Sequence, residues 1–347
     1  MTTARKMIVD PNRTRCYHCI STCVRSERLL ACDKSGKRKK WIEDRLKSLA
    51  EQFAVSVCGF AILDNHMHVL CRLDPSTATD WSDEEVVRRW LAIYPPKTMD
   101  IDNPASVAAF VKNDLKSKKK VKKYRSRLAN LGWFMKALKE PLARMANKED
   151  GVRGPFWKPR FKSIAVLDEG ALLATQTYID LNIVAAGMAE TPESSEYTSI
   201  KQRVEHARSK GKLKALQSAL LGSVAGCEAL GPIEQDHWLV PVEDYRSRDK
   251  NSREGMLESF SLGSYLALID YVSRLRREGK ARVSSELHDI FTRLETNAEA
   301  WGHQLDRMLA SAGNLRGNFF ATGSNKLREL RETRKRRVQN LSPQVIA

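Results

Sequence analysis

The sequence has no apolar run that approaches the length of a membrane span, and its first residues lack the apolar core of a signal peptide. A protein of the membrane or of its surface is therefore disfavoured, and we expect a cytoplasmic protein. No internal repeat and no low-complexity tract is visible either. The hydrophobic content of 42% is ordinary, so the chain is expected to build a real core.

Cysteine is sparse. Cys16 and Cys19 have the spacing of half a zinc site, but no second pair follows at ligand spacing, so buried small residues are the better interpretation. An odd number of cysteines without an export signal predicts reduced thiols. The seven cysteines are Cys16, Cys19, Cys23, Cys32, Cys58, Cys71 and Cys227.

Negative charge is in short supply: 42 acidic residues stand against 59 basic ones, which gives a net charge of +17. This excess favours a polyanionic partner. The densest basic run spans residues 116–127. Such a run is usually only a solvated face, but in a protein that handles DNA it is better explained by phosphate contacts, which read no sequence. The 347 residues are enough for two domains.

The most informative stretch is Asn65-His66-Met67-His68-Val69, at the end of a β-rich run over residues 53–63. Side chains alternate along a strand, so His66 and His68 point one way and Met67 points into the core. Two such imidazoles suit a divalent transition metal or, with oxygen ligands added, magnesium. Taken alone, the triplet is better explained by two polar residues on the solvated face of a strand.

A second element follows Asp168, which can cap a helix that begins with good helix formers. On this helix Tyr178 and Asn182 are four residues apart and are expected on the same face. A tyrosine hydroxyl beside an amide oxygen would serve a metal-assisted phosphodiester nuclease, as nucleophile and hard metal ligand. A core tyrosine beside a surface asparagine is the plainer alternative.

Five segments in this order resemble the HUH-type single-tyrosine transposases, and within them the bacterial REP-associated tyrosine transposases. Three positions depart from the family pattern: Asp64 and Ile183 stand where proline is usual, and Asp180 stands where histidine is usual. None of these departures removes a residue with a chemical role. The matching segments are residues 17–21, 65–70, 134–147, 154–163 and 178–187.

The resemblance implies an α+β fold over residues 1–200: a ferredoxin-like antiparallel sheet with helices, the HUH endonuclease fold, carrying an inserted helical basic segment around residues 74–130. Residues 201–347 would form a mainly α-helical extension with a basic tail, as in long members of the family. The order of the elements is compatible with such a sheet with helices on one face, whereas periodicity alone indicates only α+β. The expected order is a strand over 15–24, a helix over 41–53, strands over 53–63 and 66–73, a helix over 83–94, a helical stretch over 104–146, a strand over 156–166 and the helix after Asp168.

The resemblance also implies the site. Tyr178 would be the nucleophile, and His66, His68 and Asn182 would hold Mg²⁺ or Mn²⁺. The partner would be single-stranded or hairpin DNA, bound by a monomer or a homodimer associated with the bacterial nucleoid. Basic residues expected to contact this DNA are Arg15, Lys118, Lys119, Lys120, Lys122, Lys123, Arg160, Lys162, Arg334, Lys335, Arg336 and Arg337.

The implied reaction is cleavage and rejoining of single-stranded DNA near hairpins through a 5′-phosphotyrosine, as in a transposase. Two other classes remain open at this point. A catalytically vestigial DNA- or RNA-binding regulator would keep the charge and the fold but would not depend on a metal. A structural or protein-interaction domain would account for the helical C-terminal half but leaves the ordered motifs unexplained.

Overall fold

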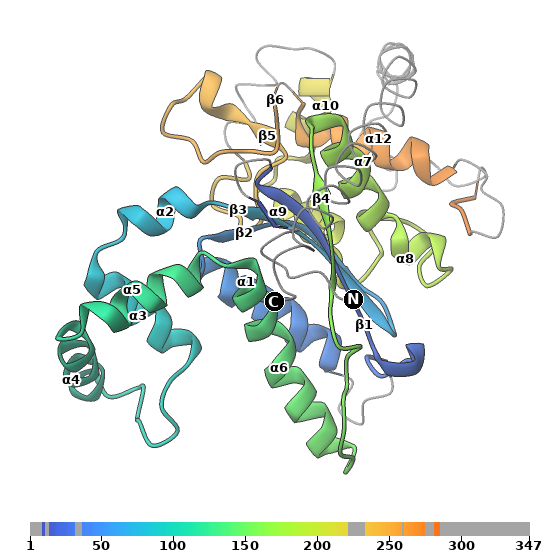
Figure 1. Ribbon diagram of the computed structural model, residues 1–347. Coiled ribbons are helices and arrows are strands. Elements are labelled where there is room, and N and C mark those ends of the chain that lie inside the picture. The colour runs from blue at the N-terminus through green and yellow to red at the C-terminus, as the bar shows by residue number, and fades with distance from the viewer. Residues whose placement is uncertain are drawn as a thin grey trace, which may run out of the picture.

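An antiparallel sheet of four strands organises the chain, in the order β2-β3-β1-β4 (Figure 1). The computed structural model describes residues 9–10, 14–31, 37–220, 233–258, 260–274 and 281–284. Helix α1 (Arg38–Gln52) leads from β1 to β2, and β3 lies between these strands, which makes a split β-α-β unit. The predicted α+β class is confirmed. The strands are β1 (Cys16–Thr22), β2 (Val55–Ile62), β3 (His66–Leu73) and β4 (Lys162–Val166).

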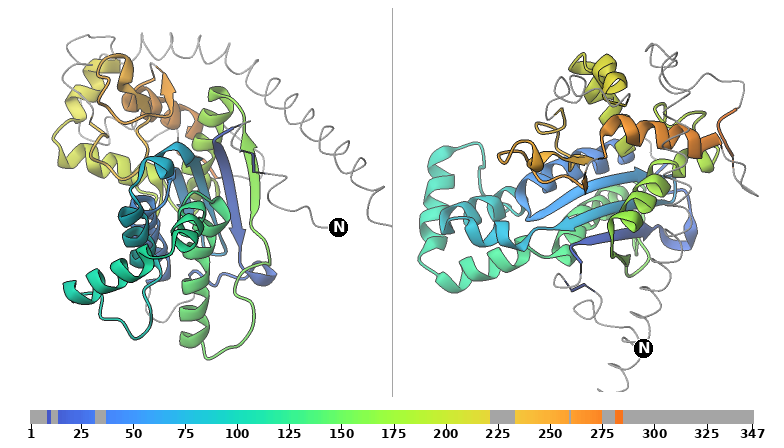
Figure 2. Two further views of the ribbon diagram at one scale, coloured as in Figure 1. Left: turned by 60° about the vertical axis from the view of Figure 1, so that its left-hand side comes forward. Right: turned by 90° about the horizontal axis from the view of Figure 1, so that it is seen from above.

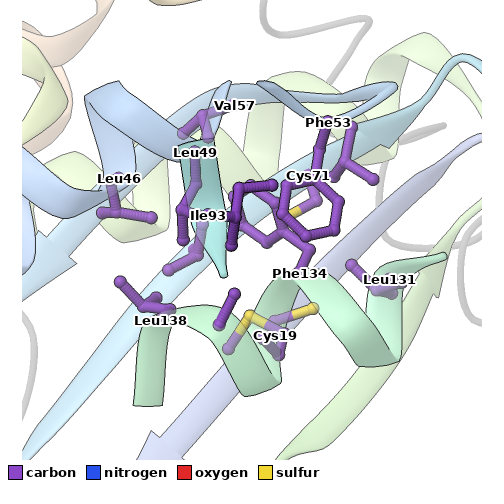
Figure 3. Close-up of a cluster of buried hydrophobic side chains, with 14 of the residues drawn as sticks. Cys19, Leu46, Leu49, Phe53, Val57, Cys71, Ile93, Leu131, Phe134 and Leu138 are labelled. Atoms are coloured by element: carbon purple, nitrogen blue, oxygen red, sulfur yellow. The ribbon is translucent and has the colours of Figure 1, made fainter. Parts of the chain in front are cut away.

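One face of the sheet is covered by α1 and by the long helix α6 (Leu131–Glu149). Ile42, Leu46 and Leu49 recur at helical spacing on α1 and are all buried. The rings of Phe53 and Phe134 meet edge to face, with centroids 5.4 Å apart, in the middle of this core (Figure 3). Alternating residues of β1, β2 and β3 pack against these helices, so this side of the sheet is a conventional apolar layer.

Between β3 and α6 the chain forms four helices, which lie to the left in Figure 1. The helical stretch expected over residues 104–146 is divided into three helices. The side chains of Ser117 and Asn130 accept hydrogen bonds from the backbone N–H groups of Lys120 and Trp133, so each begins a new helix. The four helices are α2 (Pro75–Asp80), α3 (Asp83–Ile93), α4 (Pro104–Leu115) and α5 (Lys118–Leu128).

Helices also cover the opposite face, where the sequence had predicted helices on one face only. Helix α7 (Glu169–Asp180) packs on β2, β3 and β4, and elements beyond residue 200 complete this second core. The described elements after residue 210 lie above the sheet in Figure 1 and in the left view of Figure 2, whereas α6 lies below it. The elements that follow α7 are α8 (Asn182–Ala185), α9 (Ser199–Ser209), α10 (Leu213–Leu220), α12 (Leu262–Arg274) and the short parallel pair β5 (Glu243–Asp244) and β6 (Leu257–Glu258).

The strand expected over residues 156–166 is shorter than predicted, because regular pairing with β1 begins only at Lys162. Ahead of β4 in the chain, Trp157 forms an isolated β-bridge with Cys23, and the N–H of Lys158 donates to the carbonyl of Thr22. Pro159 has no N–H to donate, which interrupts the ladder at this point. Two 3₁₀ turns, η2 (Val24–Ser26) and η3 (Tyr245–Ser247), complete the secondary structure of the described residues.

Within the described part of the chain, no helix has both the length and the apolar content needed to cross a membrane. The predicted basic tail lies outside the described residues. The tail residues concerned are Arg334, Lys335, Arg336 and Arg337.

Candidate functional site

The turn that precedes β3 is held rigidly, and this positions the histidine pair. The N–H of Leu63 donates to the carbonyl of His66 over 2.9 Å. The carboxylate of Asp64 accepts from the ammonium of Lys39 at 2.6 Å and from the guanidinium of Arg28. Burial raises the pKa of Asp64, but these two hydrogen bonds outweigh it and hold the pKa below its usual value. A charged carboxylate thus anchors the turn.

His66 and His68 share a face of β3, as predicted, while Met67 and Val69 are fully buried on the other. The two rings lie 4.9 Å apart. The Nδ1 of His66 lies 2.6 Å from the side-chain oxygen of Asn65, an acceptor, so Nδ1 must carry the proton. The Nε2 of His66 then keeps its lone pair.

The structure adds a third histidine that sequence reasoning did not include. His18 lies on β1, and its Nε2 is 2.8 Å from the Nδ1 of His68. The Nε2 of His68 is buried and, among the described residues, has no hydrogen-bond partner. A buried ring nitrogen without a hydrogen-bond partner is energetically costly in a protein core, so this nitrogen is suited to binding a ligand. Strand alternation places His18 on one face with Ile20, but only the pairing of β1 with β3 shows that this is the histidine face.

All three imidazoles are held neutral. Burial lowers the pKa of His18 to about 4 and that of His68 to about 3, and it also lowers the pKa of His66. Neutral imidazole is the form that binds metal ions. These rings therefore present lone pairs, not charge, at neutral pH.

Tyr178 faces this group from helix α7. Its ring centroid lies 5.5 Å from that of His68 and 6.1 Å from that of His18, and its side chain is 50% exposed. The carboxylate of Asp168 caps the helix by accepting from the N–H of Ala171, as predicted. The tyrosine thus lies next to the histidines of the same chain and is half-exposed.

The helix is docked on β2 at a glycine. A Cβ at Gly59 would come within 2.2 Å of the side-chain amide of Gln176, so only glycine admits this close approach.

Asn182 does not lie on the same helix as Tyr178, contrary to the prediction. Helix α7 ends at Asp180, and Asn182 is the first residue of the four-residue helix α8. Leu181, at φ −90° and ψ −2°, separates the two. Because the helix is interrupted, the four-residue spacing no longer guarantees a shared face. Asn182 is half-buried, and within the described residues its side chain makes no hydrogen bond with the histidines or Tyr178.

Asp180, which stands where the resembling family usually has histidine, is fully buried and anchors the end of α7. Its carboxylate accepts from Gln176 at 2.7 Å, from the hydroxyl of Ser199 at 2.6 Å, from the N–H of Ile200 at 2.9 Å and from the hydroxyl of Tyr265. Burial raises its pKa, which these donors counteract. The last three partners lie near or beyond residue 200, so the C-terminal part of the chain holds the tyrosine helix.

Tyr265→Phe removes one donor from this buried carboxylate and should lower the free energy of unfolding by about 1.5–3 kcal/mol, the range for hydrogen bonds to charged groups. Denaturant unfolding measures the change. Tyr271→Phe, on the same helix α12, is the matched control and should change the free energy of unfolding by less than about 0.5 kcal/mol, as surface substitutions usually do. Equal effects of the two changes would contradict the anchoring role.

The basic residues predicted to contact DNA are not gathered at one place. Helix α5, which carries Lys118, Lys119, Lys120, Lys122 and Lys123, packs against α2, α3 and α4. Its last residue, Leu128, accepts a hydrogen bond from the N–H of Ala54, which lies beside the end of β3. That end is about 24 Å from His66, since a strand rises about 3.4 Å per residue. Lys120 is ion-paired with the buried Asp114 at 2.7 Å. Arg15 binds Asp74 at 3.2 Å and also Glu254, and its hydrogen bond with Glu254 raises its pKa.

Lys162, in contrast, lies beside the histidines, and Arg160 precedes it by two residues. Lys162 pairs with Ile20 on β1, and Ile20 pairs with His68 on β3. Paired residues in a sheet point to the same face, so Lys162 and His68 share a face about 10 Å apart, at two strand spacings. Both basic side chains are exposed.

Neither a protein-family model nor a curated protein matches the chain. Among solved structures, the chain is similar to a REP-associated tyrosine transposase bound to a REP hairpin, with 13% sequence identity and a TM-score of 0.30. The similarity covers 56% of this chain and 81% of that one. At this level of similarity, function has to be argued from the site itself.

Proposed function

We propose that this protein is a metal-dependent endonuclease and strand transferase of single-stranded DNA, of the HUH type, with Tyr178 as its nucleophile. The observation that carries the proposal is the juxtaposition of an exposed tyrosine with buried, neutral histidines of the same chain. A core tyrosine would be buried, and histidines on a plain solvated face would not be desolvated. Hairpin DNA near REP-like sequences is the substrate that the sequence resemblance favours.

The donor set fits a divalent ion. His66 and His68 each have Nδ1 engaged, which leaves Nε2 of both available, and the Nε2 of His68 is otherwise orphaned. Asn182 remains the proposed oxygen ligand, one residue beyond the end of α7. When bound, Mg²⁺ or Mn²⁺ would supply Lewis-acid stabilisation of charge on the scissile phosphate.

Tyr178 would attack the phosphorus atom. The phenolic oxygen loses its proton to solvent and forms a bond to phosphorus. The bond between phosphorus and the 3′ oxygen breaks, and this oxygen takes up a proton from solvent and leaves as the 3′-hydroxyl. The product is a 5′-phosphotyrosine, which keeps the phosphodiester energy, so that a second 3′-hydroxyl can reverse the step at a new junction. Because Tyr178 is half-exposed, a DNA strand can reach it without opening the fold.

A direct test is cleavage of labelled single-stranded and hairpin DNA by the full chain, with Mn²⁺ or with EDTA. We expect cut product and a protein-linked DNA species only with the metal. Binding that persists without any cut product under all metal conditions would instead favour the vestigial regulator.

His18 is proposed as a positioning residue. His68 can offer the lone pair of its Nε2 to a metal ion only when its proton is on Nδ1. The Nε2 of His18 would accept a hydrogen bond from that Nδ1–H and so stabilise this tautomer. His18→Leu should therefore weaken Mn²⁺ binding about 10- to 100-fold, as the loss of such partners does. His18→Gln, whose amide oxygen can accept the same proton, should restore part of the affinity. Titration calorimetry with Mn²⁺ measures both.

The same variants have a readout without metal. Long-range ¹H–¹⁵N spectra of the metal-free protein should show His68 protonated on Nδ1 in the wild type and shifted toward Nε2 in His18→Leu. If His18→Leu changed neither the tautomer of His68 nor the affinity for Mn²⁺, the positioning role of His18 would be contradicted.

A further inference from the structure

A basic groove runs between α6 and residues 157–163. Its volume is about 860 Å³, and its lining includes Lys136, Lys139, Lys158, Arg160 and Lys162 against a single carboxylate, Glu140. That carboxylate is already bound by Arg144 at 2.9 Å and by Lys136 at 3.7 Å. The groove therefore concentrates positive charge in a concavity, which attracts a polyanion.

The groove begins at the level of the histidines. The N–H of Lys158 donates to Thr22 over 2.9 Å, and Thr22 is the strand partner of His66. Lys162, at the other end of this segment, is on the face of His68. Helix α6 covers the face of the sheet opposite the histidines, and residues 158 and 160 line the groove beside α6. The segment that contains them therefore connects the two faces of the sheet at its β4 edge.

We infer that this groove binds the backbone of a single DNA strand that continues from the phosphate held at Tyr178. The inference rests on the proposed function, because it takes the site as the place where the strand is cut. A single strand can bend round the sheet edge and enter a groove with one helical wall, whereas a stiff duplex does not follow such a turn.

Binding in the groove reads phosphates and not bases. Lysine is a flexible point charge, and four of the five basic side chains here are lysines. The rings in the groove are unavailable for stacking, because Trp157 and Phe161 are buried and the ammonium of Lys139 lies over them, 5.4 and 5.8 Å from their centroids. Affinity in the groove is therefore independent of sequence.

The double variant Lys136→Gln/Lys158→Gln tests this surface. Both side chains are exposed, so the fold should persist. Two lost phosphate contacts should lower the slope of log affinity against log salt by about 1.4 for a single strand, at about 0.7 for each contact. The matched control is Lys97→Gln/Lys112→Gln, which removes the same charge from two exposed side chains just before and on α4.

Binding is measured in EDTA, with the full chain and oligothymidylate strands of 6 and 20 nucleotides, and with a blunt duplex. For the 20-nucleotide strand only, the groove variant should bind more weakly and with a smaller slope of log affinity against log salt. The control should behave as the wild type does. Equal losses in the two variants, no loss in either, or a loss confined to the duplex would each overturn the inference.

Cleavage is scored separately, so that the two proposals can fail independently. If the wild type never cuts DNA but the groove variant loses DNA affinity as expected, the proposed function is refuted and strand binding in the groove is still supported. If the wild type cuts DNA but the groove variant binds DNA as tightly as the wild type does, only the inference about the groove is refuted.

Discussion

His68→Ala should lower the rate of metal-dependent cleavage of single-stranded DNA by about 10³-fold. Among the described residues the Nε2 of His68 is buried and has no hydrogen-bond partner, so its removal would delete a proposed ligand of the metal ion. A metal ion contributes several kcal/mol of charge stabilisation to such a reaction, which corresponds to a loss of roughly 10³-fold in rate. Initial cleavage rates with saturating Mn²⁺ provide the measurement.

DNA affinity in EDTA should be retained by His68→Ala, because phosphate contacts dominate binding and do not depend on this ring. His66→Ala, at a half-buried position, repeats the test where loss of packing is smaller. The control is His206→Gln on α9, which should cleave as wild type does. Full cleavage by both alanine variants, or by the wild type in EDTA, would refute the metal site.

Tyr178→Phe should lower cleavage by about 10⁴-fold or more, the scale on which removal of a catalytic nucleophile acts. The change deletes one hydroxyl and keeps the ring that packs against His68 and His18. Mn²⁺ affinity and DNA affinity should therefore equal those of the wild type, and any loss is chemical. The readouts are the rate of cut product and the amount of covalent adduct.

Tyr271→Phe on α12 serves as the control for this change, because it also deletes one phenolic hydroxyl. It should form adduct at the wild-type rate. A Tyr178→Phe protein that still forms a covalent adduct would show that another residue is the nucleophile.

The local parts of the site could be predicted from the sequence. Alternation along one strand was enough to place His66 and His68 on the same face and Met67 in the core. The capping carboxylate of Asp168 marked the start of the tyrosine helix correctly. Each of these features depends on residues within a few positions of one another, so periodicity and capping chemistry suffice to predict them.

The remaining features depend on contacts between distant residues. His18 reaches His68 only because β1 pairs with β3, and Asp180 meets Tyr265 across 85 residues of sequence. The prediction for Asn182 was wrong in its helix assignment because the chain leaves regular helical geometry at Leu181, which no strong helix breaker marks. Helices on the second face were missed because their apolar stripes do not show which side of the sheet they cover.

Peptide mapping of the covalent adduct tests the central claim most directly. The wild-type protein would be incubated with Mn²⁺ and a cleavable single strand, digested with protease and nuclease, and analysed by mass spectrometry. The account predicts a 5′-nucleotide on Tyr178, on the peptide that also contains Asp180 and Asn182. A nucleotide on any other residue, or cut DNA with no protein adduct, would contradict it.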